Sequence, residues 1–400
     1  MAIRTFGEVD QRSLKQLERC RQPEPDAPGV LCADHHPGYS MPIGGVIAYR
    51  DLVSPSAVGF DIACGNMAAR TNVRFEEVRA DVPRLMDEIW RRLSFGIGRK
   101  NAERVDSPVF ERIATSPVAP QRDLLRAARD QLGTIGSGNH YVDLFADEEG
   151  AVWVGVHFGS RGLGYRTASG FLALAQGRSF GDRVSEGGMD APPVILEAAS
   201  PLGQDYVAAM EIAGEYAYAG REWVVQKVVQ DILGADVTDR VHNHHNFAWR
   251  ETHGGETYWV HRKGATPAFP GQRGFVGGTM GEPAVILRGL ESRVSSQALY
   301  STVHGAGRVM SRTQAAGKFR GWGARRRQIA RGVVNWPAWQ RRLRDQGVEL
   351  RGGGADEAPE CYKRLSEVLR AHTGTVAIEH TLTPIGVAMA GPDVHDPFKD

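Results

Sequence analysis

The segment Gly59-Phe60-Asp61-Ile62-Ala63-Cys64-Gly65 places a carboxylate and a thiol three residues apart between two glycines. Three distant segments each add a histidine beside glycine or on an apolar run: Gly136-Ser137-Gly138-Asn139-His140, Val154 to Gly162 around His157, and His244-His245-Asn246. One thiolate, one carboxylate and three imidazoles suit a borderline divalent metal. Because these ligands come from both halves of the chain, the pattern predicts one composite domain folded around a shared site.

A sixth candidate is the histidine of His304-Gly305-Ala306-Gly307-Arg308. Glycines there let the backbone approach a phosphate closely, so His304 fits a nucleophile as well as a metal ligand. Each residue also has an ordinary alternative. A histidine beside glycine is more often structural, and a lone cysteine is more often a small buried apolar side chain. The metal hypothesis therefore depends on the whole set.

The composition is that of an ordinary globular protein: 42% of the 400 residues are hydrophobic, and the formal net charge is +1. The chain contains no apolar run long enough to span a membrane, and its first residues lack the apolar core of a signal peptide. The four cysteines form no Cys-x-x-Cys pair, which argues against a disulfide scaffold. We expect a cytoplasmic protein with no membrane partner.

Positive charge is concentrated between residues 311 and 347, where ten lysines and arginines accompany one acidic residue, Asp345. The rest of the chain is therefore net negative. The densest part is either a solvated helix face or a track for a polyanion backbone. Glycines at positions 317, 321 and 323 disfavour a regular helix there. The residues expected to contact an RNA backbone are Lys318, Arg320, Arg325, Arg326 and Arg327.

Apolar periodicity predicts helices over residues 76–95, 121–131, 204–233 and 360–371. Strand-like runs cover residues 151–157, 256–262, 284–288 and 375–390. Helices and strands alternate without a regular βαβ repeat, which favours an α+β fold over a doubly wound sheet. No internal repeat or low-complexity linker divides the chain, so residues 1–400 are expected to form a single domain.

Taken in order, these segments resemble the RtcB family of RNA ligases. The resemblance covers roughly residues 34–391. A single Gly-rich match would be weak evidence for a family, but this many motifs in the same order are specific evidence. Besides the segments around Asp61, His140, His157 and His245, the matching motifs are Asp34-His35-His36-Pro37-Gly38, Pro42-Ile43-Gly44-Gly45-Val46, Arg262-Lys263-Gly264-Ala265-Thr266, Gly277-Gly278-Thr279-Met280-Gly281, the run from His304 to Arg312, and the run from Asp356 to Lys363.

The resemblance implies a single RtcB-like domain with its own α+β architecture and a central cleft for metal and nucleotide. Members of the family use GTP and Mn²⁺, with two ions in each active site. They join RNA that ends in a 3′-phosphate, or in a 2′,3′-cyclic phosphate that is opened first, to RNA with a 5′-hydroxyl. The implied partners are RNA with broken ends, such as tRNA halves or damaged RNA, and an archease-like activator.

The resemblance also implies roles for individual residues. Asp61, Cys64, His140, His157 and His245 are similar to the family's manganese ligands, and His304 is similar to the histidine that accepts GMP. Arg161 and Lys263 resemble basic residues near the phosphates, and Tyr362 resembles an aromatic that faces the guanine. The positions that match guanylate contacts are Asn139, Asp143, Asn246, Gly277, Gly278, Thr279, Met280, Gly305, Ala306 and Gly307. The guanidinium of Arg308 is expected to pair with phosphate oxygens in bidentate fashion.

The resemblance departs from the family pattern around the nucleotide. Where the family has a lysine–glycine pair that closes over the nucleotide, this chain has Ala390-Gly391. Where the family has a glutamate three residues after the ligand histidine, this chain has Asp143, and where the family has a serine before methionine, it has Thr279. Two alternatives therefore stay open beside ligation. One is a metal-dependent phosphoesterase that opens cyclic phosphates without sealing, and the other is an RNA end-binding protein without enzymatic activity.

Overall fold

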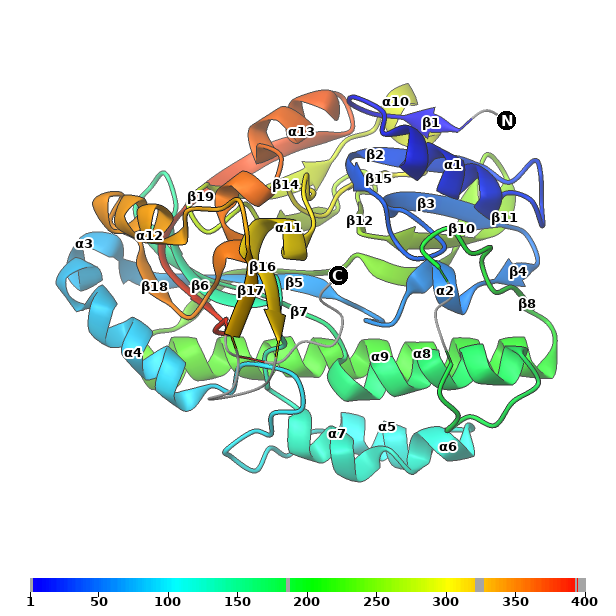
Figure 1. The fold of residues 1–400 in the computed structure, drawn as a ribbon, viewed down its shortest axis with the longest axis horizontal. Helices are drawn as coiled ribbons and strands as arrows, with labels where there is room; N and C mark the ends of the chain where they lie inside the picture. Colours follow the sequence, from blue (N-terminus) through cyan, green and yellow to red (C-terminus); the bar gives the residue numbers. More distant parts are fainter. Residues whose placement is uncertain (1–2, 185–187, 321–326, 393, 395–400) are drawn as a thin grey trace.

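The computed structural model describes residues 3–184, 188–320, 327–392 and 394, and two β-sheets form its core (Figure 1). The larger, eight-stranded sheet has the order β13-β14-β19-β6-β7-β5-β9, with β18 paired to β19. Its strands are β13 (Arg273–Val276), β14 (Ala284–Gly289), β19 (Val376–Met389), β6 (Tyr141–Ala146), β7 (Ala151–Phe158), β5 (Gly65–Arg74), β9 (Val237–His244) and β18 (Glu349–Arg351).

The smaller, five-stranded sheet has the order β1-β2-β3-β11-β10. Its strands are β1 (Arg4–Thr5), β2 (Gly29–His36), β3 (Ile43–Tyr49), β11 (Glu256–Lys263) and β10 (Asn246–His253). Three two-stranded sheets complete the set: β12 (Ala265–Pro267) with β15 (Ser301–Val303), β4 (Leu52–Val53) with β8 (Leu196–Glu197), and β16 (Gly317–Arg320) with β17 (Arg327–Arg331).

The direction of strand pairing confirms the expected α+β class. Among the described strands, β1 with β2 and β18 with β19 pair in parallel. The other paired strands are antiparallel. A doubly wound fold would need a mostly parallel sheet connected by crossover helices.

Strand β7 shows why the large sheet forms at the centre of the molecule. Its sequence, Ala-Val-Trp-Val-Gly-Val-His-Phe, is rich in β-branched and aromatic residues, and all of its positions are buried. Such a continuous apolar run is typical of a strand covered on both faces. On one face Val154 and Val156 pack with Val224, and on the other Trp153 packs with Phe275. The strand is therefore fixed on both sides, which matters because it carries His157.

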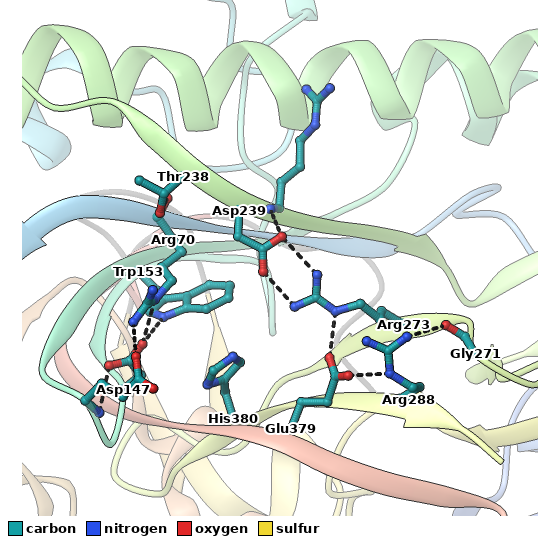
Figure 2. A network of polar contacts seen from close by, with 12 residues as sticks. Arg70, Asp147, Trp153, Thr238, Asp239, Gly271, Arg273, Arg288, Glu379 and His380 are labelled. Carbon is teal, nitrogen blue, oxygen red and sulfur yellow. Dashed lines mark hydrogen bonds and ion pairs between the residues drawn. The ribbon is translucent and has the colours of Figure 1, made fainter.

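Side chains bridge the two edges of the large sheet, β9 and β13, so that the sheet is nearly closed. The amide of Asn243 accepts a hydrogen bond from the backbone N–H of Phe275 at 2.9 Å, and the amide of Asn66 donates to the Phe275 carbonyl at 2.9 Å. Figure 2 shows an ion-pair network that reinforces this closure. In it Arg273 pairs with Asp239 at 2.9 and 2.7 Å and with Glu379 at 2.7 Å.

Helices cover the lower face of the large sheet as it is drawn in Figure 1. Helices α8 (Arg161–Ala175) and α9 (Pro201–Gln226) run side by side beneath β5 and β7. The shorter α5 (Val109–Ala114), α6 (Ala119–Arg122) and α7 (Leu125–Gln131) form a further layer below them. The remaining helices are α1 (Gln11–Cys20), α2 (Pro55–Val58), α3 (Phe75–Val78), α4 (Val82–Arg92), α10 (Arg293–Gln297), α11 (Arg312–Ala316), α12 (Trp336–Asp345) and α13 (Leu365–Ala371).

All four predicted strands are present, as β7, β11, β14 and β19, whereas the predicted helices are correct mainly in their interiors. The helix expected over 204–233 is α9, continued by a π-helical turn at Lys227–Ile232. The single helix expected over 76–95 is wrong. It is divided into α3, a 3₁₀ turn and α4, because Pro83 has no N–H to donate and is accepted only in a first helical turn.

The two other helix predictions need smaller corrections. The helix expected over 121–131 is the pair α6 and α7, separated at residues 123 and 124. The helix expected over 360–371 begins only at Leu365, since two 3₁₀ turns occupy Ala355–Glu357 and Pro359–Cys361.

The basic stretch is not one solvated helix face. It contains α11, the antiparallel pair β16–β17 and α12, and the described residues of β16–β17 are exposed apart from Gly317. Arg325 and Arg326 lie outside the described residues. No helix in the described part of the chain combines the length and apolar composition needed to cross a bilayer.

Candidate metal and nucleotide site

The strand register brings four of the predicted ligands to one end of the large sheet. Gly65, at the start of β5, lies opposite Phe158 of β7 and opposite His244 of β9. Cys64, His157 and His245 are therefore neighbours, although they are far apart in the sequence. Strand β6 begins at Tyr141, which pairs with His157, and this pairing places His140 beside the same group.

Asp61 completes the group from the loop between α2 and β5, and the five residues together are called the metal cluster below. The thiol sulfur of Cys64 lies 3.5 Å from Nε2 of His140 and 3.5 Å from Nε2 of His157. His140 Nε2 lies 3.1 Å from Oδ2 of Asp61. Gly159 is required beside this carboxylate, because a Cβ there would lie 2.2 Å from Oδ1 of Asp61.

The metal cluster contains two overlapping sets of three ligands. Cys64, His157 and His245 form one set, and Asp61, Cys64 and His140 form the other, with the ligand atoms of each set within 4.8 Å of one another. Cys64 belongs to both sets. A thiolate can bridge two metal ions, so the arrangement fits two adjacent divalent cations as well as a single one. The structure also places His245 in this cluster, whereas the neighbouring His244 packs against Tyr218 and Phe247.

The donor atoms have the protonation and orientation that metal binding needs. Asn66 Oδ1 lies 2.6 Å from Nδ1 of His157. This amide oxygen can only accept, so Nδ1 carries the proton and the Nε2 lone pair points toward Cys64. Burial lowers the pKa of His157 and His245 well below the ordinary histidine value, so both imidazoles are neutral ligands at pH 7.

The thiol of Cys64, in contrast to the two imidazoles, holds its proton at pH 7 while no cation is bound. Burial, and then the nearby carboxylate of Asp61, raise its pKa well above the ordinary cysteine value. A divalent ion must therefore displace a proton to bind the sulfur.

Arg221, on α9, ties together the segments that carry the ligands. Its fully buried guanidinium donates to the carbonyl of Ala63 at 3.0 Å and to the carbonyl of Phe158 at 2.6 Å. These carbonyls belong to the residues next to Cys64 and His157. The same guanidinium also contacts Nε2 of His242 at 2.8 Å and Nδ1 of His244 at 2.9 Å. Burial lowers the pKa of Arg221 to about 10, which still leaves it charged at neutral pH.

His304 follows β15 and lies beside the metal cluster, with its ring centroid 4.9 Å from that of His245. Its Nδ1 lies 2.7 Å from Oδ2 of Asp34, a fully buried residue of β2. The same oxygen accepts the backbone N–H of His304 at 2.9 Å and that of Gly305 at 3.3 Å. Burial alone raises the pKa of Asp34, but its electrostatic interaction and hydrogen bonds with His304 outweigh burial, and the net pKa is lowered. With Nδ1–H held by Asp34, the Nε2 lone pair of His304 is available for attack.

Several buried polar atoms around the loop that begins at Gly277 have no hydrogen-bond partner among the described residues. No described residue offers a hydrogen-bond partner to three buried atoms: Oη of Tyr141, Oδ1 of Asp143 and Oγ1 of Thr279. The Tyr141 hydroxyl lies against the loop, since a Cβ on Gly277 would be 2.4 Å from it, and its ring stacks on His157 at 5.6 Å. Buried polar groups are normally satisfied. A polar ligand at this loop would supply the partners.

Several residues with implied nucleotide roles make other contacts. Asn246 accepts the N–H of Gly264 at 2.7 Å and donates to the carbonyl of Asp61 at 3.4 Å, so its amide joins two loops of the site. Met280 packs in an apolar cluster with Leu343 and Met389. Asn139 is exposed next to His140, and Ala306 and Gly307 are buried beyond His304.

The basic residues with implied phosphate roles also contact the protein. The guanidinium of Arg308 donates to Oη of Tyr362 at 2.8 Å and to the Asp356 carbonyl at 2.8 Å, and it lies 4.9 Å from the ring of Tyr362. Arg161 donates to Oγ1 of Thr134 at 3.2 Å. Lys263 donates to the carbonyl of Tyr39 at 2.7 Å.

Three residues that hold the site were not assigned from the sequence: Asp34, Asn66 and Arg221. Asp34 belongs to the motif Asp34-His35-His36, which indicates a family position but not the role of the carboxylate. Arg221 occupies the apolar face of α9 with Ala213, Ala217 and Val224. A cation on such a face is a detectable sign of a buried polar role.

Loading the protein with Mn²⁺ should release about one proton per cluster, and the ion should bind more tightly as the pH rises. Below its raised pKa the Cys64 thiol holds a proton that competes with the metal, so affinity falls as the pH falls. Calorimetry in two buffers of different ionisation enthalpy measures this release. Cys64→Ala should lose tight binding and proton release, whereas Cys32→Ser should keep both. An unchanged proton count in Cys64→Ala would contradict the assignment.

Replacing Arg221 should weaken metal binding without any change to a ligand. Arg221→Met removes the donors that fix the carbonyls of Ala63 and Phe158, so metal affinity should fall about 10–100-fold. Arg221→Lys keeps the charge but reaches fewer acceptors, so it should recover only part of the affinity. The sulfur-to-Co²⁺ charge-transfer band reports Cys64 directly and would change in the Met variant. Wild-type affinity and band in that variant would exclude a positioning role.

Comparison with known proteins agrees with this geometry. The family described as tRNA-splicing ligase RtcB matches residues 26–121 and 114–390 of the chain. The tRNA-splicing ligase RtcB of Archaeoglobus fulgidus is 32% identical, over 90% of this chain and 88% of its own length. The RNA-splicing ligase RtcB of Mycobacterium tuberculosis is 31% identical, over 90% of this chain and 97% of its own length. The chain therefore belongs to the RtcB family of RNA-splicing ligases.

Proposed function

We propose that this chain uses GTP and two Mn²⁺ ions to join RNA 3′-phosphate or 2′,3′-cyclic phosphate ends to 5′-hydroxyl ends through a guanylylated His304. The observation that carries the proposal is the position of His304. Its Nδ1 is held by Asp34 at 2.7 Å, and its ring lies 4.9 Å from His245 of the metal cluster. An oriented imidazole beside two sets of metal ligands suits phosphoryl transfer to nitrogen.

The first step of the proposed reaction is attack by Nε2 of His304 on the α-phosphorus of GTP. A P–N bond forms while the bond to the pyrophosphate oxygen breaks, and pyrophosphate leaves. Asp34 keeps the Nδ1 proton in place and stabilises the positive charge that develops on the ring. The metal ions, when bound to the cluster, supply the positive charge that neutralises the phosphate oxygens and aligns them.

The two later steps pass the activated group to RNA and then seal the strands. An oxygen of the RNA 3′-phosphate attacks the phosphorus of the GMP held by His304, so the P–N bond breaks and the imidazole is restored. The 5′-hydroxyl of the second strand then attacks the 3′-phosphorus, loses its proton and displaces GMP. Both steps place phosphates beside Arg161 and Lys263, whose cations would stabilise the added negative charge.

The nucleotide itself is proposed to lie along the loop at Gly277–Thr279, where Tyr141, Asp143 and Thr279 present the buried atoms without partners. Gly278, Gly305 and Ala306 would let the backbone approach the phosphates. Arg308 is proposed to act by positioning Tyr362 against the base, since its donors already reach Tyr362 and Asp356. The other proposed contacts are Asn139, Asn246, Met280 and Gly307.

A second candidate function is opening of cyclic phosphates without sealing. The observation that favours it is that the metal cluster is complete while Asp143 and Ala390 differ from the family pattern at the nucleotide end. Water on a bound divalent ion is acidified, so this hydrolysis needs only the cluster.

Wild-type protein incubated with GTP labelled at the α-phosphate and Mn²⁺ should acquire covalent GMP that is labile in acid and stable in base, as a histidine phosphoramidate is. His304→Ala should acquire none, because it lacks the attacking nitrogen, and it should still bind Mn²⁺. Asp34→Asn keeps an oxygen acceptor for Nδ1–H but loses the negative charge, so labelling should slow roughly 10–100-fold.

The same labelling assay separates the competing functions. Acid-stable label, or equal labelling of His304→Ala, would place the nucleotide elsewhere. Absence of label, combined with opening of a cyclic phosphate, would favour the phosphoesterase.

Neutralising the basic hairpin, β16–β17, should weaken RNA binding and leave GMP attachment intact. The change is the triple replacement of Lys318, Arg320 and Arg327 by alanine, all of which are exposed. Since phosphate contacts carry no base identity, the weakening should be the same for different sequences. The slope of log affinity against log salt should flatten by about one for each phosphate that the variant no longer neutralises.

A matched control removes the same number of positive charges from residues 79–91, outside the basic stretch. Arg79, Arg84 and Arg91 have side-chain exposures of 68%, 62% and 66% and can be replaced together by alanine. If both triple variants show the same salt slope, the hairpin makes no RNA contact of its own.

A further inference from the structure

A shallow pocket adjoins the metal cluster on the side of α2 and the C-terminal end of α8. Its walls are formed by residues from four segments that are distant in the sequence: Tyr39, Ser56, Phe60, Leu172, Gln176 and Lys263. This hollow is called the end pocket below. Apart from Lys263, none of these residues belongs to the metal cluster or to the proposed nucleotide contacts.

The end pocket is connected to the reaction site through two short pieces of backbone. Gly59, which lines it, stands two residues before Asp61. Lys263 is followed by Gly264, and a Cβ on Gly264 would lie 3.0 Å from Cε1 of His304. Two lining residues, Gly59 and Lys263, are therefore close in sequence to Asp61 of the metal cluster and to Gly264 beside His304.

The walls offer flat aromatic surfaces together with polar edges. Phe60 lies 5.2 Å from the ring of Tyr165, which is 39% exposed, and Tyr39 at the rim is 41% exposed. Gln176 contributes an exposed amide. Apolar faces with a few hydrogen-bonding groups are the usual lining for a planar ligand, and unpaired RNA bases stack on such aromatic side chains.

Lys263 adds charge to this surface. The residue is nearly buried, at 9% exposure, and its ammonium group donates to the carbonyl of Tyr39 at 2.7 Å. This contact fixes the rim next to Ser40, which has a positive φ of 61°. It also places a cation at the rim, beside Tyr39. A nucleotide that carries a terminal phosphate matches this order of groups, with its base on the aromatic wall and its phosphate toward the cation.

We propose that the end pocket binds the last nucleobase of the RNA strand that ends in the 3′-phosphate, so that this phosphate meets Lys263 and the metal cluster. The inference rests on the proposed RNA-joining function and names the place where one of its substrates is held. Stacking tolerates every base, so the pocket selects the end of the strand rather than its sequence.

The test is equilibrium binding by fluorescence anisotropy, with a ten-nucleotide RNA labelled at its 5′ end and carrying a 3′-phosphate. Phe60→Leu keeps apolar volume but loses the flat ring, and Tyr39→Ala removes an exposed ring whose side chain is not needed for the Lys263 contact. Each should bind this RNA at least about five-fold more weakly than wild type. Ile378→Ala removes an exposed apolar side chain far from the pocket and should bind as wild type does. Thermal melting of each variant checks that it is folded.

A second RNA separates the two strand ends. It presents a 5′-hydroxyl, has a 3′-hydroxyl in place of the phosphate, and carries its label internally. If Phe60→Leu and Tyr39→Ala weaken this RNA as much as the first, the pocket serves the other strand and the proposal is overturned. Wild-type affinity for the 3′-phosphate RNA in both folded variants overturns it as well. Because binding needs no GMP transfer, absence of labelled His304 in the wild type would refute the ligation mechanism and leave this result standing.

Discussion

The register of β5 against its two neighbours is the constraint on which the site depends. Gly65 pairs with Phe158 on one side and with His244 on the other, which places Cys64 between the histidines of β7 and the β9–β10 junction. A side chain at this position would not fit, since a Cβ on Gly65 would lie 2.2 Å from the carbonyl of Asn243. A slip of one residue would turn every side chain of β5 to the opposite face.

The charges around the metal cluster explain why such a site would attract phosphates. Asp61 and the thiolate of Cys64 can supply only two negative charges. Two divalent ions would exceed them, and two guanidinium groups lie nearby, that of Arg221 buried and that of Arg161 half-buried. Burying a cation costs free energy unless its surroundings compensate for it, and Arg221 is held by carbonyl oxygens and imidazoles. The site as a whole would then be positive, and a cavity of one sign concentrates ligands of the other.

How much the sequence predicts depends on the kind of signal. Strands such as β7 and β19 are predictable because β-branched runs reflect burial, and the five metal-cluster residues are predictable because thiols and imidazoles in glycine-flanked motifs are rare. Closure of the sheet through Asn66 and Asn243 cannot be predicted from a sequence pattern. It depends on two side-chain amides that both hydrogen-bond to the backbone of Phe275, which is distant in the sequence. The same holds for Arg308, because the motif suggests a phosphate contact and does not reveal that its donors reach Tyr362 and Asp356.

Some groups of the site are fixed by the protein itself, and others have hydrogen-bonding capacity left for a ligand. Asn66, Arg221 and Asp34 fix the metal cluster and His304 before any ligand arrives, so little ordering entropy remains to be lost there. Around the loop that begins at Gly277, buried atoms of Tyr141, Asp143 and Thr279 lack partners among the described residues, and so do Oδ1 of Asp34 and Nδ1 of His140 and His245 beside the metal cluster. Each such atom destabilises the folded chain by about 1–3 kcal/mol. A ligand that hydrogen-bonds to these atoms would recover that free energy on binding. The unpartnered atoms around the Gly277 loop would therefore strengthen the binding of a polar ligand.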